Sequence, residues 1–223
     1  MPTRFKELGL DSSGDPAVLG RFWAAVTGLE HVENDDADNP GDLRGPEEGM
    51  GIGLGRQAGP KTVKHRVHLD VLARSAQDVL DLGATVAPGY EETDRWTVLL
   101  DPEGGELCVF ERDEVPAYRV HELVVDAVDP AAVAAWWGEV FDVPVRNEDQ
   151  PWHWLTDVPG MPFDSMVFQP VPEPKTVKNR LHWDVYGDVA ELLAAGATKL
   201  WELPGWTTLA DPEGNEFCVF TPR

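Results

Sequence analysis

The sequence predicts an α+β fold of four βαβββ modules, arranged as two tandem domains that form an internal pseudodimer. Residues 60–71 (PKTVKHRVHLDV) return with nine of twelve positions identical at residues 174–185 (PKTVKNRLHWDV). Residues 96–110 return at 206–220, and both copies contain the turn sequence DPEG. Each half also has two helical patterns, each followed by short strands, so the repeat unit holds two modules.

The elements follow the same order in both halves. A short strand is predicted at residues 5–11 and 120–126. Helices follow at residues 17–27 and 131–141, where Asp15-Pro16 and Asp129-Pro130 provide an N-cap and a proline suited to the first helical position. The strands at residues 66–71 and 180–185 lead into second helices, which Gly83 and Gly196 are expected to end.

The last two strands of each half flank the DPEG turn, at residues 96–100 and 106–110 and again at 206–210 and 216–220. Residues 33–55 and 146–165 carry no clear periodicity and stay unassigned. The halves are predicted to be domains at residues 1–113 and 119–223, joined by a linker at 113–118.

Composition and charge narrow the class of partners. With 42% hydrophobic and 9% aromatic residues, the chain is globular. No apolar run reaches the roughly 18 residues that span a bilayer, and the N-terminus lacks a secretory signal, which predicts a cytoplasmic protein without a membrane partner. A net charge of −22 repels phosphate backbones and argues against nucleic acid. The two cysteines are repeat mates, and we expect them to be reduced.

Strand alternation predicts which side chains share a face. If Val67, Leu69 and Val71 pack on the helices, their neighbours must point the other way. The same alternation of side-chain direction is expected in the second half and in the flanking strands. The face opposite the helices is then expected to carry two sets: Glu7, Lys64, Arg66, His68, Asp70 and Cys108, and Glu122, Lys178, Arg180, His182, Asp184 and Cys218. A glutamate, a histidine and a cysteine are thus available from each half.

These residue types allow more than one interpretation. Glutamate, histidine and cysteine together suit a divalent metal ion. Alternatively, each histidine forms a structural pair with its aspartate, each cysteine is a small buried apolar group, and the glutamates pair with arginines. The lysine–arginine pairs would bind an anionic ligand group or the protein's own acids. Trp96 and Trp206 would line an apolar pocket or pack in the core.

Several segments resemble a known superfamily: the ending DPEGNEFCVF, the strand KNRLHWDV, the Gly-Ala after the second helix, and the DPAA…WW helix. They are similar to the vicinal oxygen chelate superfamily, which includes glyoxalases, bleomycin-resistance proteins and extradiol dioxygenases, and within it to the glyoxalase-like domain. The resemblance covers nearly the whole chain, once per half. It implies a small-molecule ligand and a monomer or homodimer built from the internal pseudodimer.

The resemblance also implies site positions. The superfamily's first-strand ligand falls on Glu7 and Glu122, its histidine on His68 and His182, and its terminal-strand carboxylate on Cys108 and Cys218. Two of the three positions therefore depart from the usual ligands.

Two functions follow from these positions. The first is metal-assisted lyase or isomerase chemistry with a divalent ion held by His68, Cys108, His182, Cys218 and Glu122. In it, Glu7 and Glu122 are catalytic, and substrate contacts fall to Lys64, Arg66, Asp70, Trp96, Lys178, Arg180, Asp184 and Trp206. The alternative is a metal-free protein of the bleomycin-resistance type that sequesters a drug or metabolite. A scaffold without activity is a third interpretation.

Overall fold

The computed structural model describes residues 3–36, 39–57, 59–90 and 95–221. Its first helix, α1 (Pro16–Thr27), begins where predicted, because the Asp15 side chain accepts a hydrogen bond from the Ala17 N–H. The helix ends at Gly28, whose φ of 79° favours glycine. Its counterpart α3 (Pro130–Phe141) is capped by Asp129.

The second helix of each half is shorter. α2 (Ala76–Asp81) is capped by Ser75 and α4 (Val189–Ala194) by Asp188. Gly83 and Gly196 follow these helices with φ values of 109° and 108°, which confirms them as glycines that stop a helix. Within the described part of the chain, no helix is long and apolar enough to cross a membrane.

The strands form two eight-stranded mixed sheets, and the predicted α+β fold of four modules is confirmed. Sheet A has the order β14-β15-β16-β13-β1-β4-β3-β2 and sheet B the order β10-β11-β12-β9-β5-β8-β7-β6. The strands of sheet A are β1 (Arg4–Ser12), β2 (Glu30–Glu33), β3 (Gly41–Arg44), β4 (Ile52–Arg56), β13 (Leu181–Tyr186), β14 (Thr198–Glu202), β15 (Thr207–Ala210) and β16 (Glu216–Phe220). Those of sheet B are β5 (Val67–Ala73), β6 (Thr85–Val86), β7 (Thr97–Leu100), β8 (Glu106–Glu111), β9 (Val120–Ala127), β10 (Val145–Arg146), β11 (His153–Leu155) and β12 (Ser165–Pro170).

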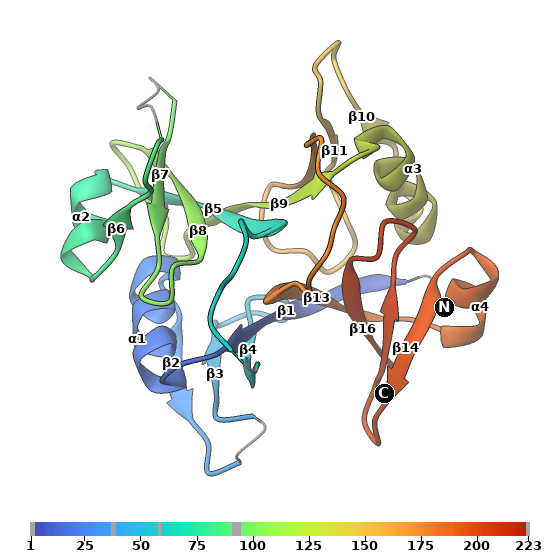
Figure 1. Cartoon of the computed structure of the whole chain (residues 1–223), viewed down its shortest axis with the longest axis horizontal. Coiled ribbons are helices and arrows are strands. Elements are labelled where there is room, and N and C mark those ends of the chain that lie inside the picture. Colours follow the sequence, from blue (N-terminus) through green and yellow to red (C-terminus); the bar gives the residue numbers. More distant parts are fainter. Residues whose placement is uncertain (1–2, 37–38, 58, 91–94, 222–223) are drawn as a thin grey trace.

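Each sheet joins one module of the first half to one module of the second. In sheet A, β1 pairs antiparallel with β13, and in sheet B, β5 pairs antiparallel with β9. Figure 1 shows both junctions near the middle of the molecule, with α1 and α2 on one side and α3 and α4 on the other. Neither half therefore completes a sheet alone.

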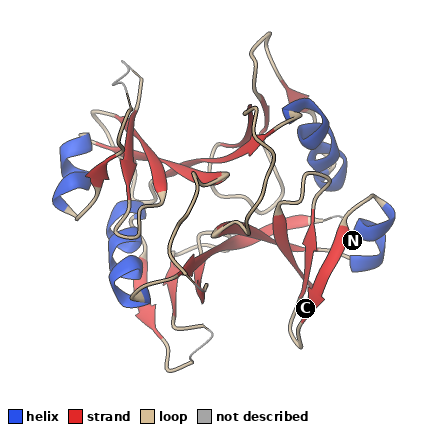
Figure 2. Cartoon of the chain, in the orientation of Figure 1, coloured by secondary structure: helices blue, strands red, loops and turns tan. Residues whose placement is uncertain are grey.

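The two modules of one half meet through their helices and through the faces of their strands that pack on those helices. The predicted inward residues of β5 (Val67, Leu69 and Val71) are at most 1% exposed and lie in the hydrophobic core. In each half, a helix tryptophan donates to the aspartate of the DPEG turn: Trp23 to Asp101 and Trp137 to Asp211, both at 3.1 Å. Figure 2 shows the four helices on the outside of the strands. The opposite sheet faces are thus left to carry the polar side chains.

Candidate functional site

Register brings the predicted site residues together on one face of each sheet. Residues paired directly across neighbouring strands point to the same side. In sheet A, Glu7 pairs with Asp184, and Asp184 pairs with Cys218. His182 lies two residues before Asp184 on β13 and therefore shares this side. We call the side that carries Glu7, His182, Asp184 and Cys218 the polar face of sheet A.

Sheet B repeats the arrangement. Glu122 pairs with Asp70, and Asp70 pairs with Cys108, while His68 precedes Asp70 by two residues. These four residues define the polar face of sheet B. Because the sheets join opposite halves, the glutamate of each polar face comes from one half and its histidine, aspartate and cysteine come from the other. The sequence left this choice of partners open.

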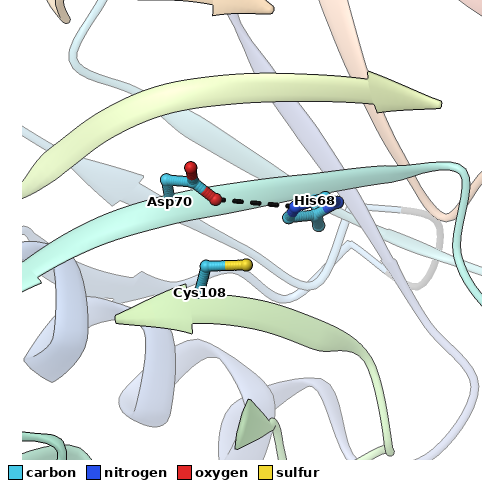
Figure 3. A group of neighbouring side chains, drawn as sticks. All are labelled: His68, Asp70 and Cys108. Atoms are coloured by element: carbon cyan, nitrogen blue, oxygen red, sulfur yellow. Dashed lines mark ion pairs between the residues drawn. The ribbon is translucent and has the colours of Figure 1, made fainter. Parts of the chain in front are cut away.

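Each polar face holds a compact group of metal-ligating atoms. One ligand atom each from His68, Asp70 and Cys108 lie within 4.8 Å of one another. The same holds for His182, Asp184 and Cys218. Figure 3 shows His68 and Asp70 on β5 with Cys108 beside them on the neighbouring strand. Glu7 and Glu122 flank these groups in register, but among the described residues the two groups contain only histidine, aspartate and cysteine.

The histidine and aspartate of each group are close without being hydrogen-bonded. His68 Nε2 lies 3.5 Å from Asp70 Oδ1, and His182 Nε2 lies 3.7 Å from Asp184 Oδ1. Two ligands at the usual zinc distances of about 2.0–2.2 Å are about 3.4 Å apart in a tetrahedron. Within the described chain, the Nδ1 atoms of both histidines and the Oδ1 atoms of both aspartates are buried without a hydrogen-bond partner. The residues present therefore fit a small divalent ion.

Burial sets the protonation states of these groups. It lowers the pKa of His68 and of His182 to about 4, so both imidazoles are neutral at pH 7 and have a lone pair for a metal. It raises the pKa of Asp184 to about 7 and that of Asp70 well above its usual range. Burial and the neighbouring aspartates raise the pKa of the thiols of Cys108 and Cys218. A bound ion would have to displace the thiol protons.

A bulge in the first strand of each half, β1 and β9, adds one more side chain to this region. Phe5 pairs with Val185 and Glu7 with Asp184, which leaves Lys6 as the extra residue. Its ammonium group contacts Glu7 and lies 4.2 Å from the centre of the Phe220 ring. Burial lowers the pKa of Lys6, while Asp184 and other acidic groups oppose that shift. In sheet B the extra residue is His121.

Aromatic rings border both polar faces. Trp206 stacks on Phe220 and Trp96 on Phe110, in each case with ring centres 5.7 Å apart. His121 meets the Phe110 ring at 5.3 Å, in the place where Lys6 meets Phe220. Trp206 is 36% exposed, so the ring at the sheet A border is accessible. Each tryptophan thus stacks on a phenylalanine of the strand that also carries the cysteine of the cluster.

The predicted lysine–arginine pairs have partners within the protein. Lys64 contacts the Asp126 carboxylate and Lys178 that of Asp11. Arg180 donates to the Asp11 carbonyl at 3.0 Å and contacts Glu103. Arg66 donates to the Glu173 carbonyl at 2.6 Å. Protein groups thus contact all four cations, although within the described chain Nε and Nη2 of Arg66 and Nη1 of Arg180 are buried without a hydrogen-bond partner.

Some residues of the polar faces were not predicted. Lys6 and His121 owe their direction to the bulges, for which neither residue type gives a signal. Gly51, Gly53 and Gly55, in contrast, give a signal in the sequence. Glycines at every second position of a strand leave one of its faces without side chains. That pattern lies in the segment 33–55, which the sequence left unassigned.

Comparisons with known proteins agree with this architecture. The family model described as "Glyoxalase-like domain" matches residues 7–110 and again 122–220. Glyoxalase I from Zea mays is similar in structure, with a TM-score of 0.66 and 13% identity over 98% of this chain and 92% of the maize chain. A candidate dioxygenase from Bacillus subtilis subsp. subtilis str. 168 has a TM-score of 0.68 and 13% identity over 98% of this chain and 84% of its own. At such identities the likeness concerns the fold. A search of curated protein sequences found no match.

Proposed function

Because this chain belongs to the glyoxalase-like domain family, with one copy in each half, we propose that it binds a small organic molecule beside a metal-binding cluster. The ion would be held by His182, Asp184 and Cys218 on sheet A, and by the equivalent three residues on sheet B. The observation that carries the proposal is the repeated cluster. Two groups built from different strands have the same three residue types at nearly the same separation.

The chemistry follows from the donors. A divalent ion bound there would act as a Lewis acid toward an oxygen atom of the ligand. Glu7 lies next to Asp184 in register and is 32% exposed at its side chain, so it can exchange a proton with a molecule on the polar face. Lys6 contacts this carboxylate. Glu122 is placed in the same way in sheet B, where Ser165 Oγ donates to it at 2.6 Å. Lyase or isomerase chemistry needs such a group to move a proton at the substrate.

Metal content tests the proposal. Untagged protein purified without chelator, loaded with Zn²⁺ and desalted, should carry two ions per chain by elemental analysis. His182→Ala and His68→Ala should each retain one ion, and the double variant none, because each removes one of three protein ligands. His31→Ala is the matched control, since His31 packs beside Gly20 and Gly41, away from both clusters.

Two outcomes would overturn metal binding. One is wild-type protein that leaves the desalting column without zinc, and the other is a double variant that binds as much zinc as the wild type. Either would favour the alternative of a metal-free sequestering protein. That alternative is supported by the aromatic stack of Trp206 on Phe220, in which Trp206 is 36% exposed.

A further inference from the structure

The two polar faces differ in one row of residues that runs across the strands. In sheet A, His182 pairs with Gly9, Gly9 with Gly53, and Gly53 with Asp42. In sheet B the corresponding row is His68, Val124, Val167 and Trp154. The histidines match, but beyond them sheet A has two glycines and an acid where sheet B has two valines and a tryptophan.

The glycines of β1 and β4 leave one position open. A Cβ added to Gly9 would lie 2.4 Å from His182 Nε2, one on Gly51 would lie 2.9 Å from Glu7 Oε2, and one on Gly55 would lie 2.3 Å from Asp11 Oδ1. Those three positions are therefore covered by side chains. A Cβ on Gly53, in contrast, would meet only the Leu8 carbonyl oxygen, at 4.0 Å. Gly53 is an uncovered floor position between Glu7, Asp11 and His182.

The same glycines also remove hydrogen-bond donors. In sheet B, Ser165 and Gln169 of β12 donate to Glu122 and Asp126, each at 2.6 Å. The residues at these places in sheet A are Gly51 and Gly55, so β4 offers no side chain to Glu7 or Asp11. Acceptor oxygens on sheet A are thus left for a donor that is not on this strand.

A buried acceptor also lies on the polar face of sheet A, as Asp70 does on that of sheet B. Asp184 is 7% exposed, it pairs with Glu7 in register, and within the described chain its Oδ1 has no hydrogen-bond partner. An unsatisfied buried acceptor costs free energy unless something donates to it. Asp42, whose Oδ2 already accepts from Arg44 and Asn34, adds a further carboxylate beside Gly53. Lys6 and Lys178 balance the charges of Glu7 and Asp11, so the region presents acceptors without being a bare anionic patch.

From these contacts we infer that only the polar face of sheet A binds the ligand, and that the ligand is a small molecule with several hydroxyl or ammonium donors seated over Gly53. This inference rests on the proposed function for placing a ligand on a polar face, but it does not need the metal. Sheet B has the same polar residues, but the side chains of Val124 and Val167 occupy the positions that Gly9 and Gly53 leave without side chains in sheet A.

Amide chemical shifts of ¹⁵N-labelled protein test the inference. Three probes separate the chemistries: myo-inositol donates through hydroxyls, 1,4-diaminobutane through ammonium groups, and succinate offers acceptors alone. We expect myo-inositol, 1,4-diaminobutane or both to shift the amides of Gly51, Gly53 and Gly55, and succinate to leave them unchanged. The amides of Ser165, Val167 and Gln169 should not move with any probe.

A pair of variants makes the test specific. Gly53→Val fills the floor and should weaken binding about tenfold or more, since one misplaced methyl group has effects of that size in a pocket. It should still fold, because valine suits a strand and the added Cβ has room. Val167→Ala is the matched control on sheet B and should titrate like the wild type.

Four results would overturn the inference. They are equal shifts in both sheets, a response to succinate as strong as to the donors, a Gly53→Val variant that titrates like the wild type, and no shift at about 50 mM, where even a millimolar site fills. Running each titration with zinc-loaded and with chelator-treated protein separates this inference from the proposed function. If the amides of Gly51, Gly53 and Gly55 shift in protein that binds no metal, the ligand site of this inference stands and the metal site of the proposed function does not.

Discussion

Sheet A and sheet B carry the same four residue types on their polar faces but differ in the residues of the neighbouring strand. Glutamate, histidine, aspartate and cysteine occupy the same register positions in both. The neighbouring strand of sheet A, β4, has glycines on this face, whereas that of sheet B, β12, carries Ser165, Val167 and Gln169. The comparison teaches that the residues retained in both halves identify a common arrangement of polar groups. The space for a ligand is decided by the residues of the neighbouring strand.

A second difference concerns the arginine that precedes each histidine strand. Arg180 is 3% exposed at its side chain and contacts Glu103, which is 11% exposed and belongs to the other half. Arg66 bonds to a single carbonyl, and within the described chain its Nε and Nη2 have no hydrogen-bond partner. Among the described residues, Arg180 thus forms a buried ion pair between the halves and Arg66 does not.

The largest expected effect comes from this arginine. Arg180→Gln should lower the free energy of unfolding by about 3–4 kcal/mol, because it leaves the Glu103 carboxylate buried without its cation. Arg66→Gln should cost about 1 kcal/mol, the value of one hydrogen bond. Urea unfolding followed by tryptophan fluorescence measures both. Equal losses would show that the two arginines play the same part and would break the comparison.

A smaller effect is expected at the floor of sheet A. Gly9→Ala places a Cβ in the position of the His182 ring and should cost about 1–2 kcal/mol while displacing the imidazole. Val124→Ala, at the same place in sheet B, should cost a similar amount by leaving a small void. Zinc content separates them, since Gly9→Ala should lose one ion and Val124→Ala none. Loss of an ion from Val124→Ala instead would show that the Val124 side chain supports its cluster.

The smallest effect depends on pH. Burial raises the pKa of Glu103, but hydrogen bonds from Ser12, Ser13 and Arg180 outweigh it and bring the pKa to about 2, from 4.5. A depressed carboxyl pKa stabilises the fold above pH 4.5, and this stabilisation is lost as the pH falls from 4.5 toward 2. Glu103→Gln should therefore be about 1 kcal/mol less stable than the wild type at pH 7. This loss is smaller than that of Arg180→Gln because the amide oxygen of the glutamine can still accept a hydrogen bond from Arg180. The gap should narrow below pH 4.5.

Glu213→Gln is the matched control for this measurement. Glu213 accepts from the amides of Val128 and Asp129 at the equivalent turn, at 2.9 and 2.6 Å. Unfolding curves of both variants at pH 7, 5 and 3.5 give the comparison. A Glu103→Gln deficit that stays constant across this range would contradict the assigned role of its charge.

Much of the fold could be read from local patterns. Leu69 and Val109 are buried because strand alternation fixes their side, and Asp15 and Asp129 cap helices because their side chains reach the first free amides. The direction of His68, Asp70 and Cys108 follows from the same alternation. The β-bulge at Lys6 could not be predicted, because it depends on how β1 fits the length and twist of β13.

The sequence by itself determined the four modules, the repeat that relates them, and the residues that leave the core, because hydrophobic period and capping chemistry act over a few neighbouring positions. Only the tertiary structure decided that Glu7 would stand beside Asp184 rather than Asp70, and that Gly53 would lie uncovered. Pairing of β1 with β13 is a choice between two nearly identical partner strands, and it is settled by how whole sheets and helices pack together.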